Sequence, residues 1–418
     1  MTLTDLIYQQ SPWFLNPGVT LRESGWFRRE LFEKLFALIT KTRQITSLVG
    51  LRRTGKSTLL KQVIIQLLAS KISPKQILFF AFDQPTVAEN TETIEALLAI
   101  YEKEVLGQKL TACQKQIYLF LDEIQLVPFW QDILKRYYDL NPNLKFVVSG
   151  SSSLFIFPAN KESLAGRIFT LTLPPLKFSE YQKLTNDNNF LAYLEFGQFP
   201  EILDLPNQEM KINYLREGVI GKVLEIDLPK IAPVRHAGDL ERLFWSLLPN
   251  AGQIIQPLQL MTDLGIKKAT LAKYLTVLEQ TLLIQKTLNL SGSFRSASRL
   301  LRKFYPAAAN FLSVVSEPLN LGFKVEAYVA SILASKTNQV FLYHQRGKEI
   351  DFVLPEEKIA AEVKYRERLH PHDWEFLANW AKKEKYQAVV ITKEGVPAVK
   401  NGPLFVPVTK LETNFPKI

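Results

Sequence analysis

A glycine-rich segment that contains a lysine and a serine carries the strongest chemical signal in the sequence. It reads GLRRTGKS and fits the pattern G-x-x-x-x-G-K-[ST]. The two glycines allow the backbone to curl so that successive N–H groups point at phosphate oxygens, and a following helix adds the positive end of its dipole. We therefore expect the nucleotide to contact the loop and the residue after it, namely Gly50, Leu51, Arg52, Arg53, Thr54, Gly55, Lys56, Ser57 and Thr58.

The residue types in this loop predict an ATP site that uses Mg²⁺. Lys56 is expected to reach the β and γ phosphates, and the Ser57 hydroxyl to bind Mg²⁺. A second metal-binding carboxylate is needed at the end of a neighbouring buried strand, and IYLFLDE supplies Asp122, which would hold Mg²⁺ through water. Glu123 would polarise the water that attacks the γ phosphate. The adjacent Asp-Glu pair favours hydrolysis, because the sequence shows no acceptor site for phosphate transfer.

Other polar residues could assist at this site. Ser149 ends the apolar run LKFVVSG and could sense the γ phosphate, although a serine-rich loop without nucleotide contact is the alternative. Arg167, Arg52 and Arg53 could each supply transition-state charge, in cis or to a neighbouring subunit. For any one of these arginines, a structural or solvated role is an equal alternative.

A second group of chemically interesting residues lies near the end of the chain. Asp351 occurs in EIDFVL, and Glu362 and Lys364 occur in AAEVKY. Alternate residues of a strand share a face, so Glu362 and Lys364 project together, and a neighbouring strand can set Asp351 beside them. Such a group can bind Mg²⁺ and orient a water for phosphodiester attack. The alternative is a pair of exposed strands with a Glu-Lys ion pair.

Basic residues in two segments are candidates for contacts with the DNA backbone. The formal net charge of +10 and the pI near 9.3 permit a polyanionic partner, but a solvated helix face is the alternative. The candidates are Lys267, Lys268 and Lys273 in KKATLAKYL, and Arg295, Arg299, Arg302 and Lys303 in SFRSASRLLRK.

Composition and length bound the class of protein. The 418 residues allow two or three domains, and 47% hydrophobic with 22% charged residues is an ordinary globular composition. The single cysteine excludes an internal disulfide and suggests a reducing compartment. Neither a secretion signal nor an apolar run of about 18 residues is present, so we expect a cytoplasmic protein without a membrane partner.

The elements that must position these residues follow from hydrophobic patterning. Nearly continuous apolar strands alternate with helices in the first part, which predicts an α/β fold with a parallel sheet covered on both faces; the strands are expected at 44–50, 76–85, 116–125, 144–153 and 168–174. From 239 to 292 three helices precede a strand hairpin, the order of a winged helix-turn-helix. The last hundred residues form further strands with two helices. We expect domains at 1–185, 186–310 and 311–418.

Several motifs occur in an order that resembles the prokaryotic AAA-like ATPases with a C-terminal domain of unknown function numbered 4143. The motifs are GLRRTGKSTLL, LFLDEIQ, FVVSGSSS, LAGRIFTLTLPPLKFSEY, FGQFPEI, EIDFVL and AEVKY. FGQFPEI has Gln198 where these proteins usually have a second glycine.

The resemblance implies a P-loop ATPase of the subclass with an extra strand between the phosphate loop and the Asp-Glu strand, which fits 76–85. It also implies a winged-helix middle and a restriction-endonuclease-like end. Lys56, Ser57, Asp122 and Glu123 would form the nucleotide site. Glu326, in FKVEAYVA, would be the fourth member of a nuclease site.

Three hypotheses for function follow. The first is an Mg-dependent ATPase whose hydrolysis changes the disposition of a winged-helix and nuclease-like module that binds or cleaves DNA. The second is a signalling or scaffold ATPase that binds a protein partner or itself, with a catalytically silent C-terminal fold. The third is an ATP-driven DNA remodeller without cleavage.

Overall fold

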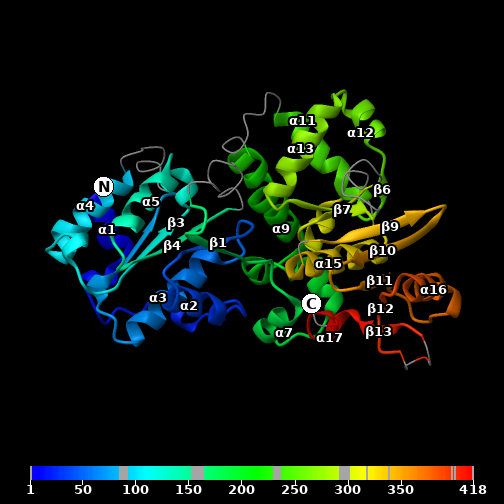
Figure 1. The fold of residues 1–418 in the computed structure, drawn as a ribbon, viewed down its shortest axis with the longest axis horizontal. Coiled ribbons are helices and arrows are strands. Elements are labelled where there is room, and N and C mark those ends of the chain that lie inside the picture. Colours follow the sequence, from blue (N-terminus) through cyan, green and yellow to red (C-terminus); the bar gives the residue numbers. More distant parts are fainter. Residues whose placement is uncertain are drawn as a thin grey trace. The chain divides into compact units, whose positions relative to one another are not determined.

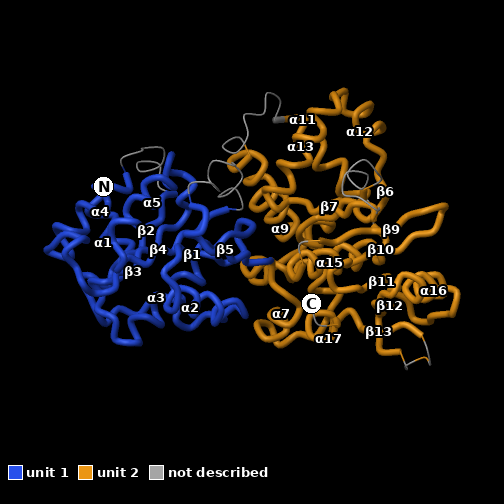
Figure 2. The backbone as a smooth tube through the Cα atoms, viewed as in Figure 1, with its two compact units in different colours: residues 1–174 blue, residues 175–418 orange. Residues whose placement is uncertain are grey.

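The computed structural model describes residues 2–83, 93–151, 164–228, 237–290, 302–316, 319–337, 339–396, 399 and 402–416. The chain divides into two compact units, unit 1 at 1–174 and unit 2 at 175–418 (Figure 2). The sequence predicted three domains with a first boundary after residue 185, whereas residues 175–185 belong to unit 2.

Unit 1 contains a parallel sheet. Its described strands follow the order β2-β3-β4-β1-β5 and are β1 (Ile45–Val49), β2 (Ile77–Ala81), β3 (Ile117–Asp122), β4 (Leu144–Gly150) and β5 (Ile168–Thr172). The extra strand expected at 76–85 is β2, and it lies at the edge of the sheet. The strand that separates β1 from β3 in space is β4, which follows both in the sequence.

Helices cover both faces of this sheet, as the patterning predicts (Figure 1). In β3, Leu119 and Leu121 pack into one apolar cluster, while Tyr118 and Phe120 pack into the other. Because alternate strand residues point to opposite faces, a strand buried on both sides must be apolar throughout. The helices of this unit are α1 (Leu3–Gln10), α2 (Phe32–Lys41), α3 (Lys56–Ala69), α4 (Thr93–Ile100) and α5 (Trp130–Leu140).

Unit 2 is built on a second sheet that mixes parallel and antiparallel pairs. Its described strands have the order β13-β12-β11-β10-β9-β7-β8-β6. They are β6 (Ile254–Ile255), β7 (Ile284–Asn289), β8 (Arg302–Pro306), β9 (Phe341–Gln345), β10 (Lys348–Leu354), β11 (Ile359–Lys364), β12 (Gln387–Thr392) and β13 (Leu404–Pro407). Parallel pairing of β7 with β9 joins the middle of the chain to its end, so one sheet crosses the boundary predicted after residue 310.

The helices of unit 2 include three that precede the β7–β8 hairpin, in the order the sequence predicted. The helices are α7 (Phe178–Thr185), α8 (Phe190–Phe196), α9 (Gln208–Asn213), α11 (Ala237–Leu247), α12 (Pro257–Leu264), α13 (Lys268–Gln280), α15 (Leu321–Lys336), α16 (Glu375–Glu384) and α17 (Leu411–Asn414). Two π-helical segments follow α9, at Tyr214–Gly221 and Val223–Asp227. β8 pairs with both β6 and β7 in antiparallel register.

The glutamine in FGQFPEI has a structural partner. The backbone N–H of Gln198 donates to Asn310 Oδ1 at 2.7 Å, and the Asn310 N–H donates to Gln198 Oε1 at 2.8 Å. Both side chains are buried. Because buried polar groups need partners, this reciprocal pair explains why a polar residue stands where the related motif has glycine.

No described helix has both the length and the apolar character needed to cross a bilayer.

Candidate functional site

The phosphate loop connects β1 to α3, and its two glycines are required by its geometry. Gly55 has φ +94°, the left-handed conformation that disfavours other residues, immediately before α3 begins. At Gly50 a Cβ atom would lie 2.5 Å from the Leu173 carbonyl oxygen, a close approach that only glycine permits. The loop is therefore held between the end of β5 and the start of α3.

Lys56 lies inside the curl of this loop. Its side chain is buried, and Nζ donates to the carbonyl oxygens of Gly50 at 3.1 Å and Leu51 at 3.0 Å. Two carbonyl groups of its own loop thus face the positive charge, which also acts on Glu123 and lowers the pKa of that carboxyl. Phosphate oxygens would be stronger acceptors for the same ammonium.

The candidate metal-binding residues lie together at the carboxyl ends of three strands. Ser57 Oγ donates to Asp122 Oδ2 at 2.5 Å, and Ser149 Oγ donates to Asp122 Oδ1. Asp122 ends β3, Ser149 lies near the end of β4, and Ser57 follows the β1 loop. The sheet order brings them together because β4 lies between β1 and β3. A hydroxyl and a carboxylate form a suitable oxygen donor pair for Mg²⁺.

Glu123 stands next to this pair in an unusual backbone conformation. Its φ is +53°, and its carboxylate Oε2 accepts from Gln125 Nε2 at 2.5 Å. Gln125 Nε2 also lies 3.4 Å from Ser151 Oγ, just beyond β4. Burial, with repulsion from Asp122, raises the pKa of Glu123, although Lys56 and Arg52 oppose the shift. A raised pKa moves a carboxylate toward the range in which it acts as a base.

Sequence reasoning missed Arg29, which braces the loop. Its guanidinium is buried and donates to the Thr54 carbonyl at 2.7 Å and to the Pro174 carbonyl at 2.8 Å. Arg29 therefore joins the phosphate loop to the last residue of unit 1. No local pattern marks this arginine, because it stands among other charged residues in FRRELFEK.

The three candidate arginines have different positions. Arg52 lies near enough to Glu123 to lower its pKa, and Arg53 is exposed in the loop with φ +62°. Arg167 precedes β5 and pairs with Asp139 through Nε at 3.0 Å and Nη2 at 3.2 Å. Its carbonyl accepts from the N–H of Ile45, the first residue of β1. Arg167 therefore lies at the amino ends of the strands, whereas the phosphate loop follows the carboxyl end of β1. This position does not favour a contact between Arg167 and nucleotide bound in the same chain.

A pocket opens beside Ser57 and Asp122, with a volume of about 480 Å³. The N-terminal segment contributes much of its wall, and Lys61 and Phe79 contribute the rest with other residues of the sheet edge. The N-terminal lining residues are Gln9, Gln10, Pro12, Trp13, Thr20, Leu21, Arg22 and Glu23. The segment before β1 thus helps to build the space next to the candidate metal-binding pair.

The C-terminal candidate residues separate into two ionic groups. Lys303 Nζ lies 2.9 Å from Glu326 Oε1, 3.2 Å from Asp351 Oδ1 and 2.5 Å from Glu349 Oε1. Glu362 instead pairs with Lys364 at 3.0 Å. Burial and repulsion from Asp351 raise the pKa of Glu326 to about 7. Burial, with repulsion from Asp351 and Glu349, outweighs Lys364 and raises the pKa of Glu362 to about 7.

The irregular geometry of β10 lies at the centre of this arrangement. Ile350 and Val353 both pack in the apolar cluster with α16, although strict alternation would place them on opposite faces. A register shift between these two residues accounts for this, and Asp351 lies within it. Asp351 Oδ1 contacts Lys303 and Oδ2 accepts from the Val363 N–H at 3.0 Å, whereas Glu362 and Lys364 share the face of Ala360.

The residues predicted to form a metal site, Glu326, Asp351, Glu362 and Lys364, are engaged in ion pairs instead. Within the described ranges, no cluster of three or more His, Cys, Asp or Glu side chains is arranged to hold a metal ion. Lys303 pairs with Glu326 and Asp351, and Lys364 pairs with Glu362, so these carboxylates already have a cation beside them. Lys303 and Glu349, which sequence reasoning did not place here, complete the cluster.

The candidate DNA-binding residues are placed in part. Lys267, Lys268 and Lys273 are exposed at and near the start of α13, whose other face buries apolar residues. Arg302 is half-buried in β8, and Arg295 and Arg299 lie outside the described residues. Lys303 has only 2% of its surface exposed. It is therefore too buried to make the predicted contact with DNA.

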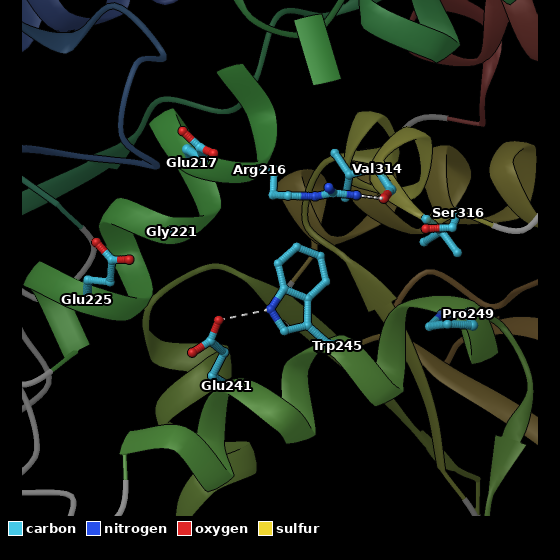
Figure 3. A pocket seen from close by; sticks show the side chains of 10 residues that line it. Arg216, Glu217, Gly221, Glu225, Glu241, Trp245, Pro249, Val314 and Ser316 are labelled. Atoms are coloured by element: carbon cyan, nitrogen blue, oxygen red, sulfur yellow. Dashed lines mark hydrogen bonds between the residues drawn. The ribbon is translucent and has the colours of Figure 1, made fainter. Parts of the chain in front are cut away.

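Unit 2 has a larger pocket, with a volume of about 740 Å³, and none of the candidate residues above lines it (Figure 3). Arg216 donates to the Val314 carbonyl at 2.9 Å on one side, and Trp245 Nε1 donates to Glu241 at 3.2 Å on the other. Glu217 and Glu225 also line it. Three carboxylates against one guanidinium make the pocket unsuited to a phosphate group.

Comparison with known families identifies two segments. Residues 42–182 match the family model of an AAA domain, and residues 187–307 match a domain of unknown function (DUF8612). The first match, with the parallel sheet and the phosphate loop, shows that this segment has the fold of a P-loop ATPase. The second model is not the domain numbered 4143 that the resemblance implied.

Related proteins span most of the chain. An uncharacterized protein of Haemophilus influenzae is 24% identical over 381 residues, covering 87% of this chain and 92% of its own length. The uncharacterized protein MJ1637 of Methanocaldococcus jannaschii is 27% identical over 373 residues, covering 77% of this chain and 75% of its own length. Among solved structures, the Walker-type ATPase PABY2304 of Pyrococcus abyssi is similar with a TM-score of 0.45 and 16% identity, covering 71% of this chain and 97% of that one.

Proposed function

We propose that unit 1 binds ATP with Mg²⁺ and hydrolyses it. The observation that carries this proposal is the cluster at the carboxyl ends of β1, β3 and β4, where Ser57 and Ser149 both donate to Asp122 and Glu123 follows it. The buried Lys56, inside the phosphate loop, lies at the same ends of the strands. Together they supply phosphate binding, metal binding and a base.

Each residue has a role that its contacts support. Lys56 would exchange the carbonyls of Gly50 and Leu51 for phosphate oxygens, which are better acceptors for an ammonium. Ser57 and Asp122 would hold Mg²⁺, because their oxygens already converge to 2.5 Å. A metal ion held there would neutralise charge on the phosphate oxygens. Ser149 would orient Asp122 and sense the γ phosphate.

Glu123 would act on the attacking water. Its pKa is raised, so the carboxylate is a better base than an exposed one, and Gln125 fixes one of its oxygens. The other oxygen can accept a hydrogen bond from water and take its proton as the water oxygen bonds to the γ phosphorus. The bond from that phosphorus to the β–γ bridging oxygen would break in the same reaction, with ADP as the leaving group. Arg52, whose charge already acts on Glu123, would stabilise the negative charge that develops.

The test compares two variants that remove different steps. Lys56→Ala should abolish nucleotide binding, whereas Glu123→Gln should keep binding and lose turnover by about 10²-fold or more, because a water-polarising group is lost. Binding of a fluorescent ATP analogue and phosphate release would be measured in both. Lys75→Ala, at an exposed lysine of the same unit, is the matched control. Undiminished ATP hydrolysis in both variants would contradict the assignment of Lys56 and Glu123 to the ATP site.

We further propose that ATP turnover is coupled to DNA binding by unit 2. The order α11, β6, α12, α13, β7, β8, with β8 between β6 and β7, supports a winged helix-turn-helix. The exposed Lys267, Lys268 and Lys273 lie at and near the start of its third helix, which enters the major groove in such folds. The ATPase rate should therefore rise with duplex DNA, and an unchanged rate with every form of DNA would count against coupling.

A protein partner is the second candidate for unit 2. The pocket lined by Glu217, Glu225, Glu241 and Trp245 supports it, because carboxylates beside an indole ring suit a cationic side chain (Figure 3). ATP turnover that DNA leaves unchanged, together with weakened binding of an arginine-rich peptide in Glu241→Gln, would favour this candidate over DNA.

A further inference from the structure

A single buried ammonium lies at the centre of the acidic cluster in unit 2. Lys303 of β8 contacts oxygens of Glu326 from α15 and of Glu349 and Asp351 from β10, all within 3.2 Å. Tyr305, two residues further along β8, donates its hydroxyl to Glu326 at 2.7 Å. Three elements far apart in the sequence therefore place their charges around one atom.

The groups around Lys303 favour its protonated, positively charged form. Burial alone lowers the pKa of an ammonium, but Tyr305, Asp351, Glu326 and Glu349 outweigh burial and raise the pKa of Lys303 above its ordinary value. Only 2% of the residue is exposed, so water does not take the place of these partners. Carboxylates gathered in a buried site repel each other unless a cation lies between them.

A divalent cation would need the same oxygens. Metal nucleases use carboxylates from a helix and from neighbouring strands to bind Mg²⁺, and the restriction-endonuclease-like resemblance implies such an ion here. The residues do not fit it, because Asp351 Oδ1 and Glu326 Oε1 already contact Lys303, and Asp351 Oδ2 accepts from the Val363 N–H at 3.0 Å. The expected partner Glu362 is bound to Lys364 instead.

We propose that Lys303 is the built-in counter-cation of Glu326, Glu349 and Asp351, and that it holds the position a divalent metal ion would take. The cluster then binds its elements together without metal, and unit 2 does not cleave DNA by metal-ion catalysis. An ammonium has donors only and binds no water as a Lewis acid, so it cannot generate a metal-bound nucleophile. This inference is independent of ATP hydrolysis in unit 1.

The experiment asks whether removing the lysine charge creates a metal site. All proteins carry Asp122→Asn, so that the nucleotide site contributes no metal binding, and no nucleotide is added. Binding of Mn²⁺ to the full chain is measured by electron paramagnetic resonance. We expect Lys303→Met to bind one Mn²⁺ about tenfold or more tightly than the Asp122→Asn parent, because three oxygen ligands lose their cation. Lys364→Met, which frees one carboxylate only, is the matched control.

Each result decides the proposal. A parent protein that binds one Mn²⁺ as tightly as Lys303→Met would overturn it, and so would a folded Lys303→Met that gains no site. If Lys303→Met unfolds but regains its circular dichroism with millimolar Mn²⁺, the proposal is supported. If Lys303→Met stays unfolded with Mn²⁺, the measurement on the Asp122→Asn parent decides. One Mn²⁺ bound per parent chain would contradict the proposal, and a parent that binds no Mn²⁺ would support it. Metal-dependent nicking of DNA by the wild type that Asp351→Asn abolishes would also overturn it.

Discussion

Arg29 donates to the carbonyl oxygen of Thr54 at 2.7 Å and so fixes the phosphate loop from outside, while its second amino group binds the Pro174 carbonyl at 2.8 Å. We predict that Arg29→Gln weakens ATP binding and lowers the free energy of unfolding. Each buried carbonyl that loses its donor costs about 1–3 kcal/mol. Urea unfolding and an ATP titration measure the two effects. Arg28→Gln, at the exposed neighbour, is the control, and equal behaviour of the two variants would contradict the prediction.

Gln125 should set the pH range of ATP hydrolysis through Glu123. Its amide donates to the Glu123 carboxylate and helps to hold the pKa of Glu123 down against burial. Gln125→Leu should therefore raise the pKa of Glu123 further and move the acid limb of the pH–rate profile to higher pH, because the base must be deprotonated to act. The rate of phosphate release at saturating ATP, measured from pH 5 to 9, tests this. Gln66→Leu is the control, and superimposable profiles would rule the role out.

Arg167 should matter little to turnover within one chain. Its side chain pairs with Asp139, and its backbone lies at the amino end of β1, at the opposite end of the strand from the phosphate loop. Arg167→Ala should keep the ATPase rate of dilute protein within a few-fold and change the stability little, as expected for an ion pair at the surface. Rates are measured over a range of protein concentrations. A large loss that appears only at high concentration would assign Arg167 to a neighbouring subunit, and a loss at every concentration would refute its placement.

The lysines of α13 should contribute phosphate contacts to duplex DNA. Replacing Lys267, Lys268 and Lys273 together by alanine should weaken binding and reduce the slope of log affinity against log salt by about 3, since each phosphate contact contributes about 0.9. Fluorescence anisotropy between about 50 and 200 mM salt measures the slope. Alanine at Lys382, Lys383 and Lys385, which are exposed at the end of α16, removes the same charge elsewhere. Equal slopes in the two triple variants would argue against an α13 interface.

Glu362 should make the stability of unit 2 depend on pH. Its pKa rises from the ordinary 4.5 to about 7 in the folded chain, so the folded state binds more protons between these values. The stabilisation is full below about pH 4.5 and is lost as pH rises through about 7. Relative to Glu362→Gln, the wild type should therefore lose on the order of 1–3 kcal/mol across this range.

Thermal unfolding of both proteins from pH 4.5 to 8 measures this difference. Glu384→Gln, at an exposed residue that ends α16, should follow the wild-type curve. Wild-type and Glu362→Gln curves that run parallel over the whole range would show that Glu362 keeps an ordinary pKa.

The sequence by itself determined the phosphate loop and the fold of unit 1. Gly50 and Gly55 are required by local backbone geometry, which is written in the residues themselves. Apolar strands of about six residues between amphipathic helices leave a parallel two-faced sheet as the arrangement that buries them. The strand that ends at Asp122 and the strand that carries Ser149 near its end could be predicted for the same reason, since polar residues after an apolar run mark the end of a strand.

Only the tertiary structure decided which of these ends meet and what lies between the C-terminal acids. Periodicity fixes a strand but not its neighbour, so the position of β4 between β1 and β3 had no local signal. The buried Arg29 and Lys303 looked like ordinary surface charges, because a side chain becomes buried through contacts distant in sequence. Lys303 meets Asp351 from 48 positions away. The register shift in β10 around Asp351 had no local signal either, because alternation in a regular strand does not predict such a shift.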